Sequence, residues 1–428
     1  MSIDAVAFRL ALKKGLGRSM LMLRSDPDNP ALRDALLDAC IMNDVYDRQC
    51  ESTRDGYLHR LISVSGQSPF FWDALRGRLG AGFHDDHDVA QIFAILCLIA
   101  AEDQRFDRQE LRTFLQCASD HLVEPCMWAL VKLDGIDGVL LGIHRIYESV
   151  VADLDGEGWL VQQLIQTLKE RDGEEQSSKA VEYARTVCPE LDRLMVLVAE
   201  KAPRPAPAGP KNYAEFKANV EAGRSPRTAW VRDADQTDII LAAQDMLAER
   251  DERRVRSYLR VFRERAFPLP AATLFPLTRH ENPMIAYGAM RILGRIRSPE
   301  VRTAALDFLA AGRVRDALDL LQANYHSGDF EVIGRAIERS VLNDETCHRI
   351  GFSVLHLLEQ SPAVIQESVP VLLWLYENEP CTLCRRDVVR RLGEGGALPG
   401  WMAEEVVFDA EPRVPDQAVA HPPSGNCS

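Results

Sequence analysis

The chain has 428 residues, of which 46% are hydrophobic and 27% charged, so it can build a folded core and is too long for a single one. Its formal net charge is −14, which disfavours a nucleic-acid-binding surface because such surfaces are normally basic. No apolar run reaches the ~18 residues needed to span a bilayer, and the N-terminal residues do not resemble a secretory signal. We therefore expect a cytoplasmic protein of two or more domains.

Residues 1–200 are predicted to form an all-helical N-terminal domain. Val89, Phe93 and Leu96 recur at helical spacing, which places them on one apolar stripe. Asn29 precedes a proline, and this pair is typical of the first residues of a helix. Alternating strand patterns bounded by turns are essentially missing, so the sequence predicts an all-α fold.

Three acidic segments of this domain contain residue types that bind metals. Residues 84–88 read HDDHD and come directly before a predicted helix, where acidic side chains cap free amides and oppose the helix dipole. Residues 103–110 lack the central glycine of a calcium loop, and residues 153–158 lack its terminal glutamate at the right distance. We interpret all three as helix caps and turns.

A proline-rich segment, KAPRPAPAGPK, occupies residues 201–211. Proline at alternate positions excludes a helix and gives a stiff, extended linker. The segment therefore separates the N-terminal domain from a second helical domain, which is predicted over residues 212–408. Residues 409–428 contain four prolines and little apolar content, so we expect a disordered tail there.

The second domain contains the one concentrated basic element of the chain. Four arginines recur at i, i+3, i+7 and i+10, so they share one face of a predicted helix, although acidic residues in the same stretch partly neutralise them. A solvated face with internal ion pairs is the favoured interpretation, and a contact surface for an acidic partner is the alternative. The four residues are Arg253, Arg256, Arg260 and Arg263.

Residues 298–311 follow a recognisable pattern, in which a capping serine precedes Val301 and Arg302, and further apolar residues complete the stripe. A second copy places Cys384 and Arg385 at the corresponding positions, about two repeats of ~40 residues later. This pattern resembles the second helix of a HEAT repeat.

The resemblance covers residues 282–393, and the segment 343–359 within this range departs from it. The resemblance implies a HEAT-like α-solenoid of antiparallel helix pairs that binds partners along a concave groove. It implies no particular chemistry.

Cys381 and Cys384 form a CxxC motif. A tetrahedral zinc site needs four ligands, and the nearest further candidates are Cys347 and His348, which a helical hairpin could bring back. A thioredoxin-like motif would need a βαβ unit, which the sequence does not predict. We therefore expect the two thiols to be packed as small hydrophobes, with no metal and no cofactor.

No phosphate-binding glycine loop, GxSxG or HExxH motif is present, so the sequence does not predict an enzyme. The leading hypothesis is a binding scaffold, adaptor or immunity-type inhibitor that holds a protein partner. The alternative is a HEAT-like nucleic-acid-binding protein or DNA glycosylase-like enzyme, which the acidic net charge opposes. A metal-dependent catalyst that uses the CxxC or HDDHD residues is the third and weakest hypothesis.

Overall fold

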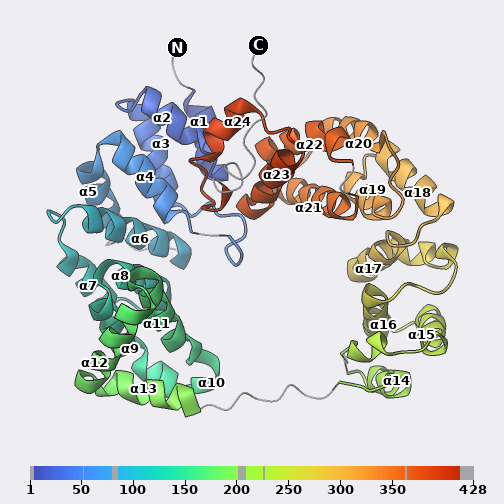
Figure 1. Cartoon of the computed structure of the whole chain (residues 1–428), viewed down its shortest axis with the longest axis horizontal. Coiled ribbons are helices and arrows are strands. Elements are labelled where there is room, and N and C mark those ends of the chain that lie inside the picture. Colours follow the sequence, from blue (N-terminus) through green and yellow to red (C-terminus); the bar gives the residue numbers. More distant parts are fainter. Residues whose placement is uncertain are drawn as a thin grey trace. The chain divides into compact units, whose positions relative to one another are not determined.

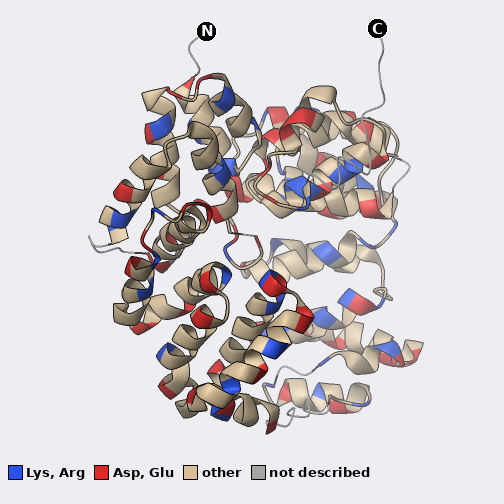
Figure 2. Ribbon diagram, turned by 60° about the vertical axis from the view of Figure 1, so that its left-hand side comes forward, with Lys and Arg blue, Asp and Glu red and all other residues tan. Residues whose placement is uncertain are grey.

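The computed structural model describes residues 4–51, 53–79, 85–200, 209–224, 227–361 and 364–414. These residues form 24 α-helices and three short 3-10 helices, and no strand occurs among them (Figure 1). The all-α prediction is therefore confirmed. No helix in the described ranges combines the length and the apolar character that a bilayer crossing requires. Basic and acidic residues are interspersed along the helices (Figure 2).

The chain divides into two compact units. Unit 1 comprises Met1–Arg204, Cys381–Leu383 and Pro399–Ala420, and unit 2 comprises Pro205–Pro380, Cys384–Leu398 and His421–Ser428. The helices of unit 1 are α1 (Ala5–Lys14), α2 (Arg18–Ser25), α3 (Pro30–Ile41), α4 (Asp55–Ser65), α5 (Ser68–Leu79), α6 (Asp86–Glu102), α7 (Arg108–Cys117), α8 (Asp120–Asp134), α9 (Ile136–Ala152), α10 (Leu154–Glu157), α11 (Trp159–Asp172), α12 (Glu174–Val187), α13 (Pro189–Glu200) and α24 (Gly400–Val406).

Helix α6 forms the centre of unit 1. It packs against α3, α4, α5 and α8, and its predicted stripe of Val89, Phe93 and Leu96 is at most 1% exposed. A helix that is apolar on nearly all sides must be covered by neighbours, because each exposed apolar face would cost solvation free energy. The predicted cap also forms, since the Asn29 side chain accepts a hydrogen bond from the amide of Ala31 at 3.0 Å.

The last described residues pack inside unit 1, where the sequence predicts the start of a disordered tail. Arg18 pairs with Glu405 at 2.9 Å, and the amide of Ala410 donates to the carbonyl of Gly15 at 2.9 Å. Asp409 and Val414 are at most 1% exposed. The order of residues 409–414 comes from contacts with helices at the other end of the chain, which local composition does not record. Residues 415–428 lie outside the described residues.

Unit 2 contains the remaining helices. They are α14 (Tyr213–Glu221), η1 (Ala229–Arg232), α15 (Gln236–Ala248), α16 (Glu252–Glu264), η2 (Ala271–Thr273), η3 (Phe275–Arg279), α17 (Pro283–Leu293), α18 (Pro299–Ala310), α19 (Val314–Leu321), α20 (Asp329–Glu338), α21 (Asp344–Gln360), α22 (Ile365–Asn378) and α23 (Thr382–Glu394), whose first two residues are assigned to unit 1. The expected linker spans residues 201–211, of which residues 201–208 lie outside the described part of the chain.

Two series of contacts organise unit 2. Helices α16, α17, α19 and α21 contact one another in that order, and α18, α20 and α22 form a second series. Helix pairs such as α18–α19 and α21–α22 join the two series. Figure 1 shows these helices following one another along unit 2.

Close approach within the first series depends on Gly294, which follows α17. A Cβ atom at this position would lie 1.9 Å from the carbonyl oxygen of Asp319 in α19. Any side chain there would force the two helices apart, because a clash with a backbone atom cannot be relieved by rotating a side chain.

Candidate functional site

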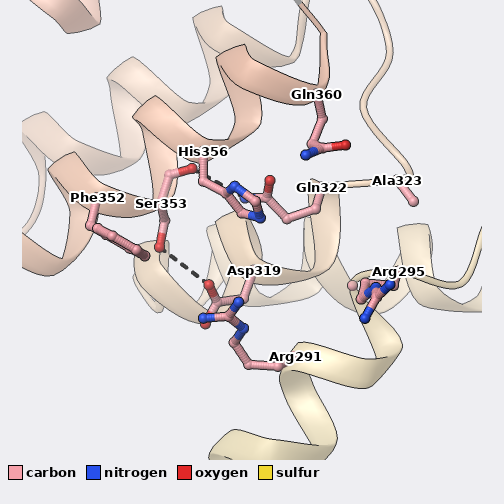
Figure 3. A pocket seen from close by; sticks show the side chains of 10 residues that line it. Arg291, Arg295, Asp319, Gln322, Ala323, Phe352, Ser353, His356 and Gln360 are labelled. Atoms are coloured by element: carbon pink, nitrogen blue, oxygen red, sulfur yellow. Dashed lines mark hydrogen bonds between the residues drawn. The ribbon is translucent and has the colours of Figure 1, made fainter. Parts of the chain in front are cut away.

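A pocket of about 430 Å³ opens between α17, α19 and α21 of unit 2 (Figure 3). A second pocket of about 270 Å³, between α16 and α17, shares Arg291 and Arg295 with it. The two together are called the arginine groove below. Its polar and charged lining residues are Arg263, Arg291, Arg295, Asp319, Gln322, Ser353, His356 and Gln360.

Two arginines lie at the point that the two pockets share. Arg291 contacts the hydroxyl of Tyr287 at 3.2 Å, and Arg295 donates to the carbonyl of Phe262 at 3.3 Å and to that of Arg263. The last carbonyls of α16 attract a cation because they form the negative end of the helix dipole. Both arginines are exposed, and the charge of Arg291 acts on the carboxylate of Asp319, where it opposes the rise in pKa that burial causes.

Hydrogen-bond acceptors line the pocket that Figure 3 shows. One carboxylate oxygen of Asp319 accepts from the Ser353 hydroxyl at 3.2 Å, whereas its other oxygen has no partner among the described residues. The Gln322 amide nitrogen donates to the carbonyls of Leu318 and Ser353, both at 3.1 Å, and its buried side-chain oxygen has no partner in the described part of the chain. Burial raises the pKa of Asp319, and the nearby Arg315 partly opposes this shift.

These groups can bind a ligand, but they do not form a nucleophilic catalyst. The Ser353 hydroxyl bonds to Asp319 itself, while His356 Nδ1 faces Glu359 at 3.4 Å. A Ser-His-Asp arrangement would need the imidazole between the hydroxyl and the carboxylate. The two exposed arginines suit a ligand that offers negative charge, whereas the unpartnered oxygens of Asp319 and Gln322 are themselves buried.

The predicted arginine row lies on the exposed side of α16. All four of its members are exposed, while the opposite side of α16 buries Val255, Tyr258 and Phe262. Only Arg263 also lines the arginine groove. The four arginines of the row are Arg253, Arg256, Arg260 and Arg263, and their contact with a partner stays a prediction.

Sequence reasoning missed Arg291 and Arg295 because they belong to different structural elements. Arg291 lies in the last turn of α17, and Arg295 lies beyond its end. A signal was present, since GRIR follows the apolar stripe of this helix at residues 294–297. Helical periodicity places these residues at the end of a helix and does not indicate that they line a pocket.

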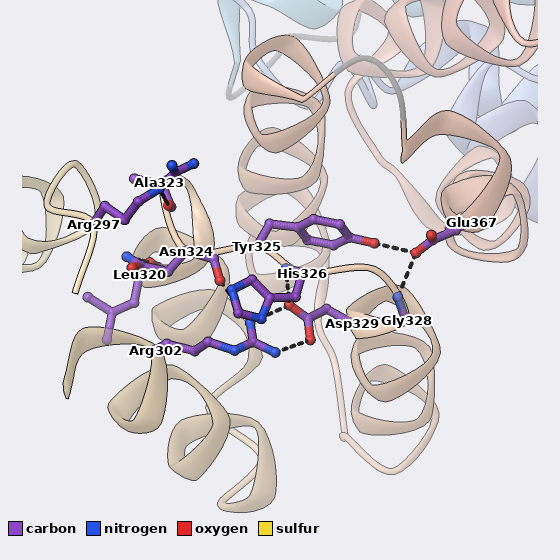
Figure 4. A network of polar contacts seen from close by, with 10 residues as sticks. All are labelled: Arg297, Arg302, Leu320, Ala323, Asn324, Tyr325, His326, Gly328, Asp329 and Glu367. Carbon is purple, nitrogen blue, oxygen red and sulfur yellow. Dashed lines mark hydrogen bonds and ion pairs between the residues drawn. The ribbon is translucent and has the colours of Figure 1, made fainter. Parts of the chain in front are cut away.

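A polar network joins α18, α20 and α22 (Figure 4). Arg302 binds both carboxylate oxygens of Asp329, at 2.7 and 2.8 Å, and also donates to the carbonyl of Asn324. Asp329 is 4% exposed, so this pair is largely removed from water. Arg302, which the sequence pattern places off the apolar stripe, therefore reaches the next helix pair.

The same network continues to α22 through Glu367. Its carboxylate accepts hydrogen bonds from the hydroxyls of Tyr325 and Ser327, both at 2.6 Å, and from the amide of Gly328 at 2.8 Å. These three bonds hold its pKa below the usual value. Because every residue has a clear structural partner, we interpret this network as a tie between helix pairs.

The acidic segments of unit 1 cap helices and turns, as predicted. Asp85 accepts from the amide of His87 at 2.8 Å, and Asp153 accepts from that of Gly156 at 2.9 Å. Asp103 accepts from the amide of Arg105 at 2.9 Å. His84 lies outside the described residues.

The structure brings both cysteines of the CxxC motif to a histidine. One potential ligand atom from each of His348, Cys381 and Cys384 lies within 4.8 Å of the others. His348 was one of the two residues considered as a further ligand, and the second, Cys347, is buried but not part of this group. None of the nine described cysteines is part of a disulfide.

The chain was compared with protein-family models, with curated proteins and with solved structures. No family model matches it, and neither a curated protein nor a solved structure does. The function must therefore be inferred from the geometry of these residues.

Proposed function

We propose that this protein is a non-catalytic binding scaffold that holds an extended acidic segment of a partner protein in the arginine groove. The observation that carries the proposal is that the two neighbouring pockets share Arg291 and Arg295 in their linings. A groove that crosses several helices can accommodate a chain of several residues, whereas a closed pocket suits a small molecule.

The order of helix contacts supports a HEAT-like solenoid for unit 2. Helices α16, α17, α19 and α21 form one contact series, and all four carry residues of the arginine groove. In a solenoid each helix pair buries a face of the next, and one series of helices forms a continuous binding surface. The Arg302–Asp329 pair would then be one of the ties between repeats.

The groove chemistry favours a peptide over nucleic acid. The exposed guanidinium groups of Arg291 and Arg295 suit the carboxylates of an acidic peptide. An ionised Asp319 would repel either ligand, but the repulsion is stronger for a phosphate backbone because it carries one negative charge per nucleotide. The net charge of −14 would also oppose the approach of a polyanion.

The first test is a selection from an array of short peptides that vary in acidic content, probed with the full-length protein. We expect acidic peptides to bind, and the strongest of them to lose at least about 10-fold in affinity in the variant R291E/R295E, as measured by fluorescence anisotropy. The matched control is R335E, because Arg335 is an exposed arginine of α20 that pairs with Glu331 of its own helix.

Three outcomes would contradict the proposal. Acidic peptides would be absent from the selection, R291E/R295E would bind as well as the wild type, or R335E would weaken binding equally. Tight, salt-dependent binding of duplex DNA that is weakened by substitution of Arg291 and Arg295 would instead favour the nucleic-acid hypothesis. Charge reversal at Arg256 and Arg260 tests whether the exposed row of α16 extends the surface.

A further inference from the structure

His348, Cys381 and Cys384 surround a common point next to α21. His348 lies in the first half of α21, Cys381 directly precedes α23, and Cys384 is in its first turn. With one ligand atom from each within 4.8 Å of the others, a small shift suffices to place all three at zinc-ligand distances of about 2.0–2.3 Å. The residues come from two chain segments, so the grouping is not a simple consequence of the CxxC spacing.

A buried carboxylate holds the histidine from behind. Glu379, at the end of α22, is fully buried, and its Oε1 lies 2.8 Å from His348 Nδ1. A metal-binding histidine usually gives its second ring nitrogen to a carboxylate in this way, which fixes the tautomer and the orientation of the ring. With Nδ1 engaged by Glu379, Nε2 is the nitrogen that a metal would take.

Helix α21 makes room for that carboxylate at Gly351. A Cβ atom on Gly351 would lie 2.1 Å from Glu379 Oε2. Gly351 is one turn beyond His348 on the same helix, and a glycine inside a helix is less favourable than an alanine. The space it leaves is filled by the group that orients the histidine, which gives this glycine a purpose in the site.

We propose that His348, Cys381 and Cys384 bind one zinc ion, with Glu379 positioning the histidine. Two thiolates and one imidazole are a donor set that zinc prefers, and oxygen-seeking ions such as magnesium and calcium do not. The three side chains leave one coordination position, and the partial exposure of His348 and Cys384 opens that position to water. The ion would link α21 to the start of α23, independently of the arginine groove.

The test uses the full-length protein, reduced and stripped of metal with a chelator. Cobalt(II) serves as a spectroscopic substitute for zinc, because bound cobalt shows ligand-field bands and a thiolate charge-transfer band. We expect one cobalt per chain, displaced by one equivalent of zinc, and zinc should raise the melting temperature of the wild type. Either C381S or C384S should weaken the thiolate band and lower zinc affinity, and H348A should lower the affinity further.

Substitutions around the site separate a metal centre from ordinary packing. E379Q keeps the size of the side chain but loses the carboxylate, and we expect about 10–100-fold weaker zinc binding with the same thiolate band. C347S, at the buried cysteine beside His348, and C117S, at an exposed cysteine, should leave the cobalt spectrum unchanged. Circular dichroism checks that each variant is folded.

The proposal is overturned if the reduced wild type binds no stoichiometric zinc or cobalt. It is also overturned if C381S, C384S and H348A all bind as tightly as the wild type. If the reduced protein binds neither zinc nor cobalt and a Cys381–Cys384 disulfide forms on oxidation, the two thiols are a redox-active pair rather than metal ligands. None of these outcomes bears on peptide binding in the arginine groove.

Discussion

Asp319 is the residue of the arginine groove whose charge depends most clearly on its surroundings. Burial raises its pKa above the ordinary value of 3.8. The folded state therefore binds this proton more tightly than the unfolded state does. The stabilising effect is complete below the unfolded-state pKa and is lost as the pH rises through the raised folded-state pKa.

The variant D319N should be more stable than the wild type at about pH 7, because it removes an ionised carboxylate that the fold solvates poorly. The difference should shrink as the pH falls toward the ordinary pKa of aspartate, where the wild type is protonated in both states. Urea unfolding at a series of pH values measures this. A wild type that is the more stable protein at neutral pH would show that the groove arginines stabilise the carboxylate.

Residue types and caps could be predicted from the sequence, but residue partners could not. The capping roles of Asn29 and Asp85 follow from their position before a helix, because a cap is a local interaction. Arg302 could be placed off the apolar stripe by periodicity. Its partner Asp329 lies across a helix pair, and no local pattern specifies such a contact.

At the scale of helices, the Arg302–Asp329 pair ties α18 to α20. The side chains are 21% and 6% exposed, so removing the arginine leaves a poorly solvated carboxylate. We expect R302A to lower the free energy of unfolding by about 3 kcal/mol, as measured by chemical denaturation. In the double variant R302A/D329A the loss should be smaller than the sum of the two single losses.

The control for this pair is R335A. Arg335 pairs with Glu331 one turn away on the same helix, and both side chains are at least half exposed. Its removal should change the free energy of unfolding by no more than about 0.5 kcal/mol. Equal effects of R302A and R335A would show that the buried pair does not tie the helices together.

The positions of the helices are easier to predict from the sequence than the contacts between them. Stripes such as that of α6 are periodic in the sequence, so burial follows from the spacing alone. The arginine groove and the His348–Cys381–Cys384 group arise where separate helices meet. The sequence supplies the candidate metal ligands. It does not show that they meet, because the approach of His348 to the two cysteines is a tertiary contact.

At the scale of the whole chain, both ends contribute to unit 1. Helix α24 contacts α2, and the segment that follows it hydrogen-bonds to Gly15 and Arg60. Met402, Val406 and Val414 are fully buried. The predicted boundary at residue 408 follows a change in composition, whereas the structural unit closes by contacts between residues 349 and 387 positions apart.

A chain that ends after residue 398 should therefore lose stability in unit 1 selectively. The deletion exposes the apolar surfaces that α24 covers and leaves the carbonyl of Gly15 without its partner amide. Hydrogen exchange followed by mass spectrometry should show faster exchange in α1, α2 and α4, with α17 and α19 unchanged.

The reference is a chain that ends after residue 414, which keeps every described contact of this segment. If the shorter chain protects α2 as well as the reference does, the packing of the C-terminal segment contributes little to the stability of unit 1. Equal acceleration in α17 and α19 would instead show that the two units unfold together.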